Sequence, residues 1–447
     1  MLNWKMSKSK IFLFSFIFVG LLLRIYLAVT LPIWHDEAYA IWASKNQLFN
    51  IIQGITDRVH PPGYYLLLFL WGKISDHLYW YRFLSIISFL FNTYILYKLG
   101  KRIKDASFSL ILVFLYCFSG YFVIFDWQVR MYSLIVSLML LSIFIFDKGI
   151  NNKHKGKLIY WIFFTIVNVS GLYIDYSYLW YYIPLTLFSL IFFTIKNNQK
   201  YLLVTLSLLL SGVFFLLIHS SFVTTYKQGI EGITWAKPYL LPTFFVPYLL
   251  GTHKNVLLTF TLMFFSLLGI KIAFSRKSFS TIVLVLLFSS IFSLCFSLIY
   301  SLFFSPLLHV RSLQIVGITI ILLISFSIYY FCMNISKYLF LVFYIVIFMN
   351  FILVTQTIII SPSKVLVSFF PWKKVISSLD VKNTKKIEYR VSRQLPTPLL
   401  LWGLEYTLKG KESFKIKNIK LEEIDLSTKD ENCVLFYDSF ISLYSCR

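Results

Sequence analysis

Two adjacent carboxylates follow the first long apolar run of the chain. The residues read WHDEAYAIW, which places Asp36 and Glu37 just beyond the apolar segment at residues 11–31. Charged groups at the edge of a membrane are costly and usually have a function. A carboxylate in this position can take a proton from a hydroxyl group or help to hold a divalent cation. The structural alternative is a helix cap, because Asp and Glu also favour the first turn of a helix.

Two further segments carry groups suited to phosphate chemistry. In TDRVHPPGYY, His60 precedes two prolines, so it lies at a rigid bend and can donate a hydrogen bond from there. In FDWQVRMYSL, Arg130 stands beside Tyr132, four residues after Asp126. A guanidinium can bind phosphate in a bidentate manner. The alternatives are a structural imidazole for His60 and snorkelling to lipid phosphate for Arg130.

Two later segments extend this set. Asp175 in GLYIDYSYL is either a site residue or a helix cap, and Arg311 in HVRSLQIVGI is either a second phosphate ligand or an interfacial anchor. The segment at residues 225–242 reads as an external substrate loop whose residues cannot be ranked.

The composition shows what must position these groups. The chain has 447 residues, of which 58% are hydrophobic and only 14% are charged, which predicts an all-α polytopic membrane protein. The first apolar run is too long for a cleaved signal peptide and is predicted to be a retained anchor. About eleven spans are expected, at residues 11–31, 82–98, 106–124, 131–146, 158–174, 177–195, 201–219, 256–274, 279–304, 312–330 and 338–360.

The charges predict an orientation. With the N-terminus in the cytoplasm, the inner loops hold 17 Lys or Arg and the outer segments before the tail hold nine, as the positive-inside rule requires. Seven of the nine acids in the first 360 residues then face outwards. The net charge of +23 therefore reflects topology and lipid headgroups, not nucleic-acid binding. We expect a multi-pass plasma-membrane protein with its C-terminal part outside.

Two regions outside the spans should be ordered. The external loop at residues 32–81 should carry short interfacial helices at 38–52 and 63–74. We divide the chain into a transmembrane domain, 1–360, and a small extracytoplasmic α/β domain, 361–447. In the latter, strands are predicted at 386–393, 413–421 and 433–439, and helices at 371–379 and 397–410. No disulfide framework is evident, although Cys433 and Cys446 could pair.

The ordered motifs resemble a known family. The DE pair, HPPGYYLLLFLW, the basic-ended span YRFLSIISFLFNTYILYKLGKRI and FDWQVRMYSLIVSLML are together similar to the GT-C superfamily of membrane glycosyltransferases. The similarity is greatest to the RgtA/B/C/D-like branch, related to protein O-mannosyltransferases and the lipid A aminoarabinose transferase (glycosyltransferase family 39/83-like). It covers roughly the first 180 residues and is weak afterwards.

This resemblance implies transfer of a hexose or pentose from a polyprenyl-phosphate carrier to a lipid, glycan or protein acceptor at the outer face. Asp36 would be the general base or the group that orients the acceptor, with Glu37 in support. The family pattern departs at Gln128, where relatives carry a Glu, so that Asp126 would take over the carboxylate role. It departs again at Asp175, where relatives often show a Thr-His-Tyr run.

Several alternatives stay open. Asp36, Glu37 and Asp126 would be the ligands of a divalent cation, Mg or Mn, if one is used. A lipid or glycan flippase would show inverted repeats and ionisable groups at the membrane midplane, and the sequence shows no internal repeat. A catalytically inactive assembly protein is a third reading, because the Gln128 and Asp175 departures could mark lost activity.

Overall fold

The computed structural model describes most of the helical part of the chain. The described residues are 8–31, 33, 35–54, 60–151, 158–220, 222, 246–252, 255–275, 280–303, 310–334, 345, 346, 348, 349 and 352, together with the strands at 386–391, 420–423, 433–438 and 441–446.

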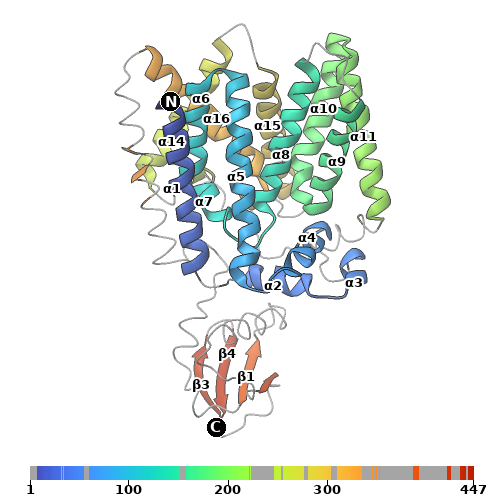
Figure 1. The fold of residues 1–447 in the computed structure, drawn as a ribbon, viewed down its shortest axis with the longest axis vertical. Helices are drawn as coiled ribbons and strands as arrows, with labels where there is room; N and C mark the ends of the chain where they lie inside the picture. The colour runs from blue at the N-terminus through green and yellow to red at the C-terminus, as the bar shows by residue number, and fades with distance from the viewer. Residues whose placement is uncertain are drawn as a thin grey trace, which may run out of the picture.

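Long apolar helices form a bundle whose members run roughly side by side (Figure 1). Within the described residues, eight helices are long and apolar enough to cross a membrane. They are α1 (Lys8–Thr30), α5 (Leu78–Ile103), α8 (Tyr132–Asn151), α10 (Leu179–Lys196), α11 (Gln199–Ile218), α14 (Val256–Ser275), α15 (Thr281–Phe303) and α16 (Gln314–Asn334).

Two of the remaining predicted spans correspond to shorter apolar helices, α6 (Ala106–Phe118) and α9 (Leu158–Ile174). The apolar run at 106–124 divides at Ser119, after which α7 (Gly120–Phe125) begins. Gly120 packs against the backbone of Gly251, and a side chain at either position would clash there. The eleventh predicted span, 338–360, lies almost wholly outside the described residues. The chain is therefore a multi-pass membrane protein, for which eleven spans stay a prediction.

The bundle has a buried centre and a lipid-accessible rim. Helices α5, α8 and α16 are mostly enclosed by protein, whereas α1, α11 and α14 expose most of their apolar surface. Helix α5 contacts α6 and α8, and α16 contacts α6, α14 and α15. Buried Ser, Thr and Asn side chains line these contacts. Small polar residues let membrane helices approach closely and hydrogen-bond.

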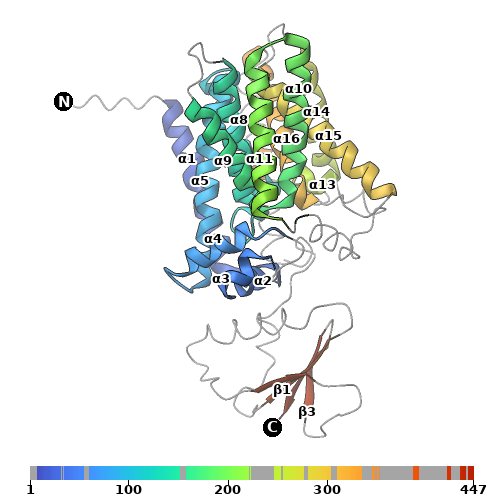
Figure 2. The ribbon, with the colours of Figure 1, turned by 90° about the vertical axis from the view of Figure 1, so that its right-hand side faces the viewer.

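Short helices cover one end of the bundle (Figures 1 and 2). They are α2 (His35–Ser44), α3 (Leu48–Ile52) and α4 (Gly63–Gly72), which lie in the predicted loop at 32–81. The first predicted interfacial helix, 38–52, is divided between α2 and α3. We call this the loop-helix end. Short elements between and after the spans are η1 (Tyr176–Tyr178), α13 (Val246–Leu249) and η4 (Val310–Ser312).

Glycine determines how α4 approaches the bundle. A Cβ atom at Gly63 would overlap the backbone carbonyl of Tyr173, near the end of α9. Only glycine therefore allows the start of α4 to pack directly against α9. The contact brings the HPP bend, which precedes α4, close to Asp175, which follows α9.

The C-terminal region contains a four-stranded sheet. Its strands are β1 (Lys386–Val391), β2 (Lys420–Glu423), β3 (Cys433–Asp438) and β4 (Ile441–Cys446), in the order β2-β1-β4-β3. Strands β1 and β2 are parallel, whereas β4 pairs antiparallel with β1 and β3. The predictions at 386–393 and 433–439 match β1 and β3. The one at 413–421 overlaps only the start of β2, and β4 was not predicted. The helices expected at 371–379 and 397–410 lie outside the described residues, so the α/β domain stays a prediction.

Candidate active site

Asp36 forms an ion pair across the loop-helix end. It lies in the first turn of α2, and its Oδ2 atom is 2.9 Å from Nη1 of Arg311 in η4. The hydroxyl of Tyr121 in α7 donates to the carbonyl of Val310 and so holds η4 in place. The side chains of Asp36 and Arg311 are 21% and 14% exposed. Both charges thus remain accessible from outside the bundle while being positioned by three separate elements.

Glu37 points the other way, into the protein. Its two carboxylate oxygens accept hydrogen bonds from Nε and Nη2 of Arg82 at 2.9 and 2.6 Å, and both side chains are fully buried. Arg82 also donates to the carbonyl of Ala28, in the last turn of α1, and to that of Leu31, which follows α1. The pair thus joins α1, α2 and α5. Glu37 is adjacent to Asp36 in sequence, yet its role in the structure is to hold the helices together.

His60 lies between a cation and an anion. Its Nε2 atom is 3.0 Å from Nη2 of Arg130, and its Nδ1 atom is 3.5 Å from Oδ2 of Asp175. Asp175 also accepts the backbone N–H of Ser177 at 2.5 Å and so caps η1. The structure therefore confirms the cap predicted for Asp175, whose place in the site stays a prediction. Three of the residues selected from sequence meet in this triad.

The electrostatics of the triad favour a charged Asp175. Burial alone would raise the pKa of this carboxyl group. The hydrogen bond and charge of His60, together with the bonds from Ser177, outweigh burial and hold the pKa below its usual value. Asp175 therefore stays ionised throughout the neutral range and supplies a fixed negative charge to the imidazole.

A hydrogen bond from Val129 to Glu37 links the triad to the Asp36 pair. Oε1 of Glu37 accepts the backbone N–H of Val129 at 2.9 Å. Glu37 is the residue after Asp36, and Val129 is the residue before Arg130. The hydrogen bond therefore joins the two chain segments that carry Asp36 and Arg130. The Glu37–Arg82 pair thus fixes the spacing between Asp36 and Arg130.

Two tyrosines lie near Arg130. Its guanidinium lies 5.8 Å from the ring centre of Tyr132. The Tyr64 hydroxyl is buried and has no hydrogen-bond partner among the described residues. Burial raises the pKa of Tyr64 well above its usual value, against the opposing charge of Arg130. Tyr64 is therefore a neutral, buried hydroxyl beside the cation.

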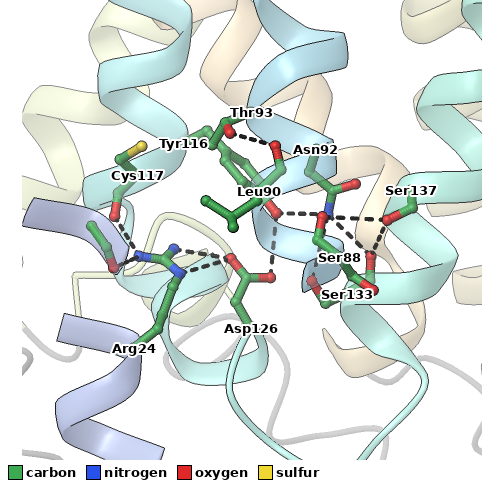
Figure 3. A network of polar contacts seen from close by, with 11 residues as sticks. Arg24, Ser88, Leu90, Asn92, Thr93, Tyr116, Cys117, Asp126, Ser133 and Ser137 are labelled. Carbon is green, nitrogen blue, oxygen red and sulfur yellow. Dashed lines mark hydrogen bonds and ion pairs between the residues drawn. The ribbon is translucent and has the colours of Figure 1, made fainter. Parts of the chain in front are cut away.

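Asp126 occupies a different place, within the bundle (Figure 3). Its Oδ2 atom accepts two hydrogen bonds from Arg24 of α1, at 3.3 and 2.9 Å, and both side chains are fully buried. The Tyr116 hydroxyl donates to its other oxygen, and Asn92 donates to Tyr116. Asp126 was predicted to bind substrate or a metal ion. Its carboxylate is fully buried and hydrogen-bonded to Arg24 and Tyr116. Gln128 is likewise fully buried.

The structure does not assemble the predicted cation ligands. Asp36, Glu37 and Asp126 lie in three separate ion pairs. Within the part of the chain that the structure describes, no group of three His, Cys, Asp or Glu side chains is arranged to hold a metal ion. Asp57, Arg58, His309 and the segment 225–242 lie outside the described residues.

Two structural arginines were missed by the sequence analysis. Arg82 was counted only as an outer basic charge, and Arg24 was not singled out at all. A signal for Arg24 existed, because it interrupts the apolar run at 11–31, and an ionisable residue inside a span almost always has a partner. The identity of that partner, 102 residues away, has no local signal.

Comparison with solved structures identifies the architecture. The chain resembles the archaeal oligosaccharyltransferase AglB from Archaeoglobus fulgidus in complex with an inhibitory peptide and a dolichol-phosphate, with a TM-score of 0.53 and 11% identity over 86% of this chain and 59% of that chain. The apo form of the Archaeoglobus fulgidus oligosaccharyltransferase gives a TM-score of 0.51 and 11% identity over 84% of this chain and 59% of that chain. The chain therefore shares the helical fold of these archaeal oligosaccharyltransferases.

This shared fold agrees with the GT-C fold that the sequence resemblance implies, whereas the RgtA/B/C/D-like branch stays a hypothesis. The chain spans less than two thirds of the length of the archaeal proteins. No protein-family model matches the sequence, and no curated protein matches it. The relationship is therefore visible in the helix arrangement and not in overall sequence identity.

Proposed function

We propose that this protein is a membrane glycosyltransferase of the GT-C superfamily that moves a sugar from a polyprenyl-phosphate carrier to an acceptor. The observation that carries the proposal is the presence of two ionic groups, Asp36–Arg311 and Asp175–His60–Arg130, at the loop-helix end. Asp36, Arg311 and His60 are partly exposed, whereas Arg130 and Asp175 are buried behind them. A transferase needs cations for the phosphate leaving group and a basic group for the acceptor. Both kinds of group are present within one small region.

The arginines are suited to the donor phosphate. Arg130 and Arg311 each present a guanidinium whose existing partner, His60 or Asp36, is itself partly exposed. Charge-assisted bonds from Arg to phosphate are strong and often bidentate. The isoprenoid tail of the donor would lie among the lipid-accessible helices. AglB has been observed with a dolichol-phosphate, which supports a carrier of this class here.

Asp36 serves as the general base or as the group that orients the acceptor. In the reaction, an acceptor hydroxyl oxygen bonds to the anomeric carbon and loses its proton to a protein base. The bond from that carbon to the phosphate oxygen breaks, and its electron pair stays on the departing polyprenyl phosphate. A single displacement of this kind inverts the anomeric configuration. The acceptor is a lipid, a glycan or a protein, and the sugar is a hexose or pentose.

The finer assignments belong to the same proposal. We place the protein in the RgtA/B/C/D-like branch and in the plasma membrane, with the N-terminus in the cytoplasm. The loop-helix end and residues 361–447 then face outwards, and Asp36, Asp76 and Asp175 lie at or next to the loop-helix end. A flippase would instead need ionisable groups along a water-filled path. The ion pair within the bundle, Arg24–Asp126, is fully buried and offers no such path.

The experiment is sugar transfer by the purified full-length chain from a panel of polyprenyl-phosphate hexoses and pentoses. We expect Asp36→Asn to reduce transfer by about 10²-fold or more, while farnesyl phosphate still binds. Asp76→Asn is the matched control, because Asp76 pairs with Lys45 at the surface. Unchanged turnover in Asp36→Asn would remove Asp36 from the reaction, and an inactive wild type with every donor would refute the function.

A further inference from the structure

The hydrogen bonds around His60 define where its proton lies. A guanidinium has donors and no acceptor, so Arg130 must donate to Nε2 across the 3.0 Å contact. Nε2 therefore carries the lone pair, and the ring proton of the neutral imidazole resides on Nδ1. That atom faces Oδ2 of Asp175 at 3.5 Å. The imidazole is thus held with its basic nitrogen turned away from the carboxylate and towards the cation.

The arrangement matches the physical requirements of a general base. An imidazole has an ordinary pKa of about 6.5, against about 4 for a carboxylate, and a base works best when its pKa lies near the working pH. A buried carboxylate on the far nitrogen fixes the tautomer and stabilises the imidazolium that forms, as in hydrolytic triads. Asp36, by contrast, is already paired with Arg311.

Among the described residues, the charged groups in contact with His60 are Asp175, which follows α9, and Arg130, which precedes α8. Tyr132 of α8 and the neutral, buried hydroxyl of Tyr64 in α4 lie near Arg130. Among these neighbours Asp175 is the anion and Arg130 the cation. Any phosphate that binds Arg130 would compete with His60 for the same N–H groups and would release Nε2.

We propose that His60, oriented by Asp175, is the group that accepts the acceptor's proton, and that donor binding at Arg130 makes His60 available. This inference rests on the proposed glycosyl transfer. The acceptor oxygen bonds to the anomeric carbon as its proton passes to Nε2 of His60. The electron pair of the broken carbon–oxygen bond leaves on the polyprenyl phosphate. Asp36 then orients the acceptor, and Asp175 is a positioning residue that does not itself take the proton.

The test is the pH dependence of single-turnover transfer at saturating donor, with the purified full-length chain and the polyprenyl-phosphate sugar that supports transfer. The wild-type rate should rise with pH as the base loses its proton. His60→Gln should lose this dependence and about 10²–10⁴-fold in rate, with its affinity for farnesyl phosphate within about twofold of wild type. Added imidazole should partly restore His60→Ala.

Two further variants sharpen the result. Asp175→Asn should lower the rate and shift the ionisation while leaving donor affinity unchanged, which a purely structural cap would not do. His77→Gln, which changes an exposed histidine at the start of α5, should behave like wild type.

The inference is overturned if His60→Gln keeps the wild-type pH profile, or if it loses farnesyl phosphate affinity while keeping its rate at saturation. The second outcome would make His60 a donor ligand only. Absence of transfer by wild type with every donor would instead refute the proposed function, and this inference with it.

Discussion

Asp36 and Glu37 are adjacent in the sequence, but their side chains lie in different surroundings. Successive side chains on a helix differ by about 100° in direction, so Asp36 reaches Arg311 near the surface while Glu37 reaches Arg82 in the interior. The sequence analysis assigned both carboxylates to catalysis. In the structure Asp36 is the partly exposed carboxylate of the two, whereas Glu37 is buried and binds the segment that contains Arg130.

Glu37→Gln should strongly destabilise the protein. The change removes the charge that balances the fully buried Arg82, and breaking a buried ion pair typically costs about 3–5 kcal/mol in the free energy of unfolding. Thermal unfolding of the purified protein in detergent would measure this. Asp76→Asn, which breaks the exposed Lys45–Asp76 pair, should cost less than about 1 kcal/mol. Equal losses in the two variants would contradict the structural role of Glu37.

Arg130→Ala should weaken donor binding. Losing one charge-assisted hydrogen bond of about 1.5–3 kcal/mol corresponds to roughly a tenfold to hundredfold rise in Kd. Titration with farnesyl phosphate, compared with farnesol, isolates the phosphate contribution. Lys73→Ala is the control, since Lys73 is exposed and contacts the Phe69 ring. If Arg130→Ala prefers farnesyl phosphate over farnesol as strongly as wild type does, Arg130 is not a phosphate ligand.

At the scale of elements, the contact of α4 with α9 sets the His60–Asp175 distance. The sequence predicts α4 from its apolar residues and predicts the bend from its prolines. It does not show that Gly63 faces a carbonyl of α9, because that contact joins elements more than 100 residues apart and leaves no local pattern. The same limitation explains why the pairing of Asp36 with Arg311 could not be predicted.

Gly63→Ala should therefore separate the two elements. The added methyl group would overlap the Tyr173 carbonyl, so that α4 must move and the His60–Asp175 contact must lengthen. We expect a lower melting temperature in detergent and a rate loss comparable with that of Asp175→Asn. Gly212→Ala is a milder control, because its nearest atom is the Tyr182 hydroxyl at 2.9 Å, the tip of a side chain. Wild-type transfer by Gly63→Ala would show that this close approach is dispensable.

At the scale of the whole molecule, hydrophobic patterning was sufficient to locate the helices but not their partners. The eight long apolar helices coincide with predicted spans, because about 20 apolar residues are needed to cross the hydrocarbon layer. The division of 106–124 at Ser119 and the closed Arg24–Asp126 network depend on packing between distant segments. The candidate site could be predicted in part. Its residues were selected from their types and motifs, but only the structure shows that His60, Arg130 and Asp175 are in contact while Asp126 lies elsewhere, inside the bundle.

The sheet register makes a disulfide feasible at the C-terminus. Cys433 of β3 lies directly opposite Cys446 of β4. Paired residues in antiparallel strands have Cα atoms about 4.5–5.5 Å apart, within the range for disulfides. If this region faces outwards, the two thiols should be oxidised in protein from the native membrane. A membrane-impermeant maleimide applied to intact cells should label the pair only after reduction, and the Cys433→Ser/Cys446→Ser variant should abolish that signal. Labelling without reduction would contradict the disulfide.

The central claim is that a polyprenyl-linked sugar is transferred at the loop-helix end, on the outer face. Proteoliposomes of defined orientation would test it most directly, because the charged headgroup of the donor does not cross the bilayer unaided. With donor and acceptor supplied from one side only, sugar transfer and release of polyprenyl phosphate should occur in equal amounts when that side carries the loop-helix end. They should be absent in the opposite orientation. Transfer from the opposite side, or no transfer from either, would contradict the account.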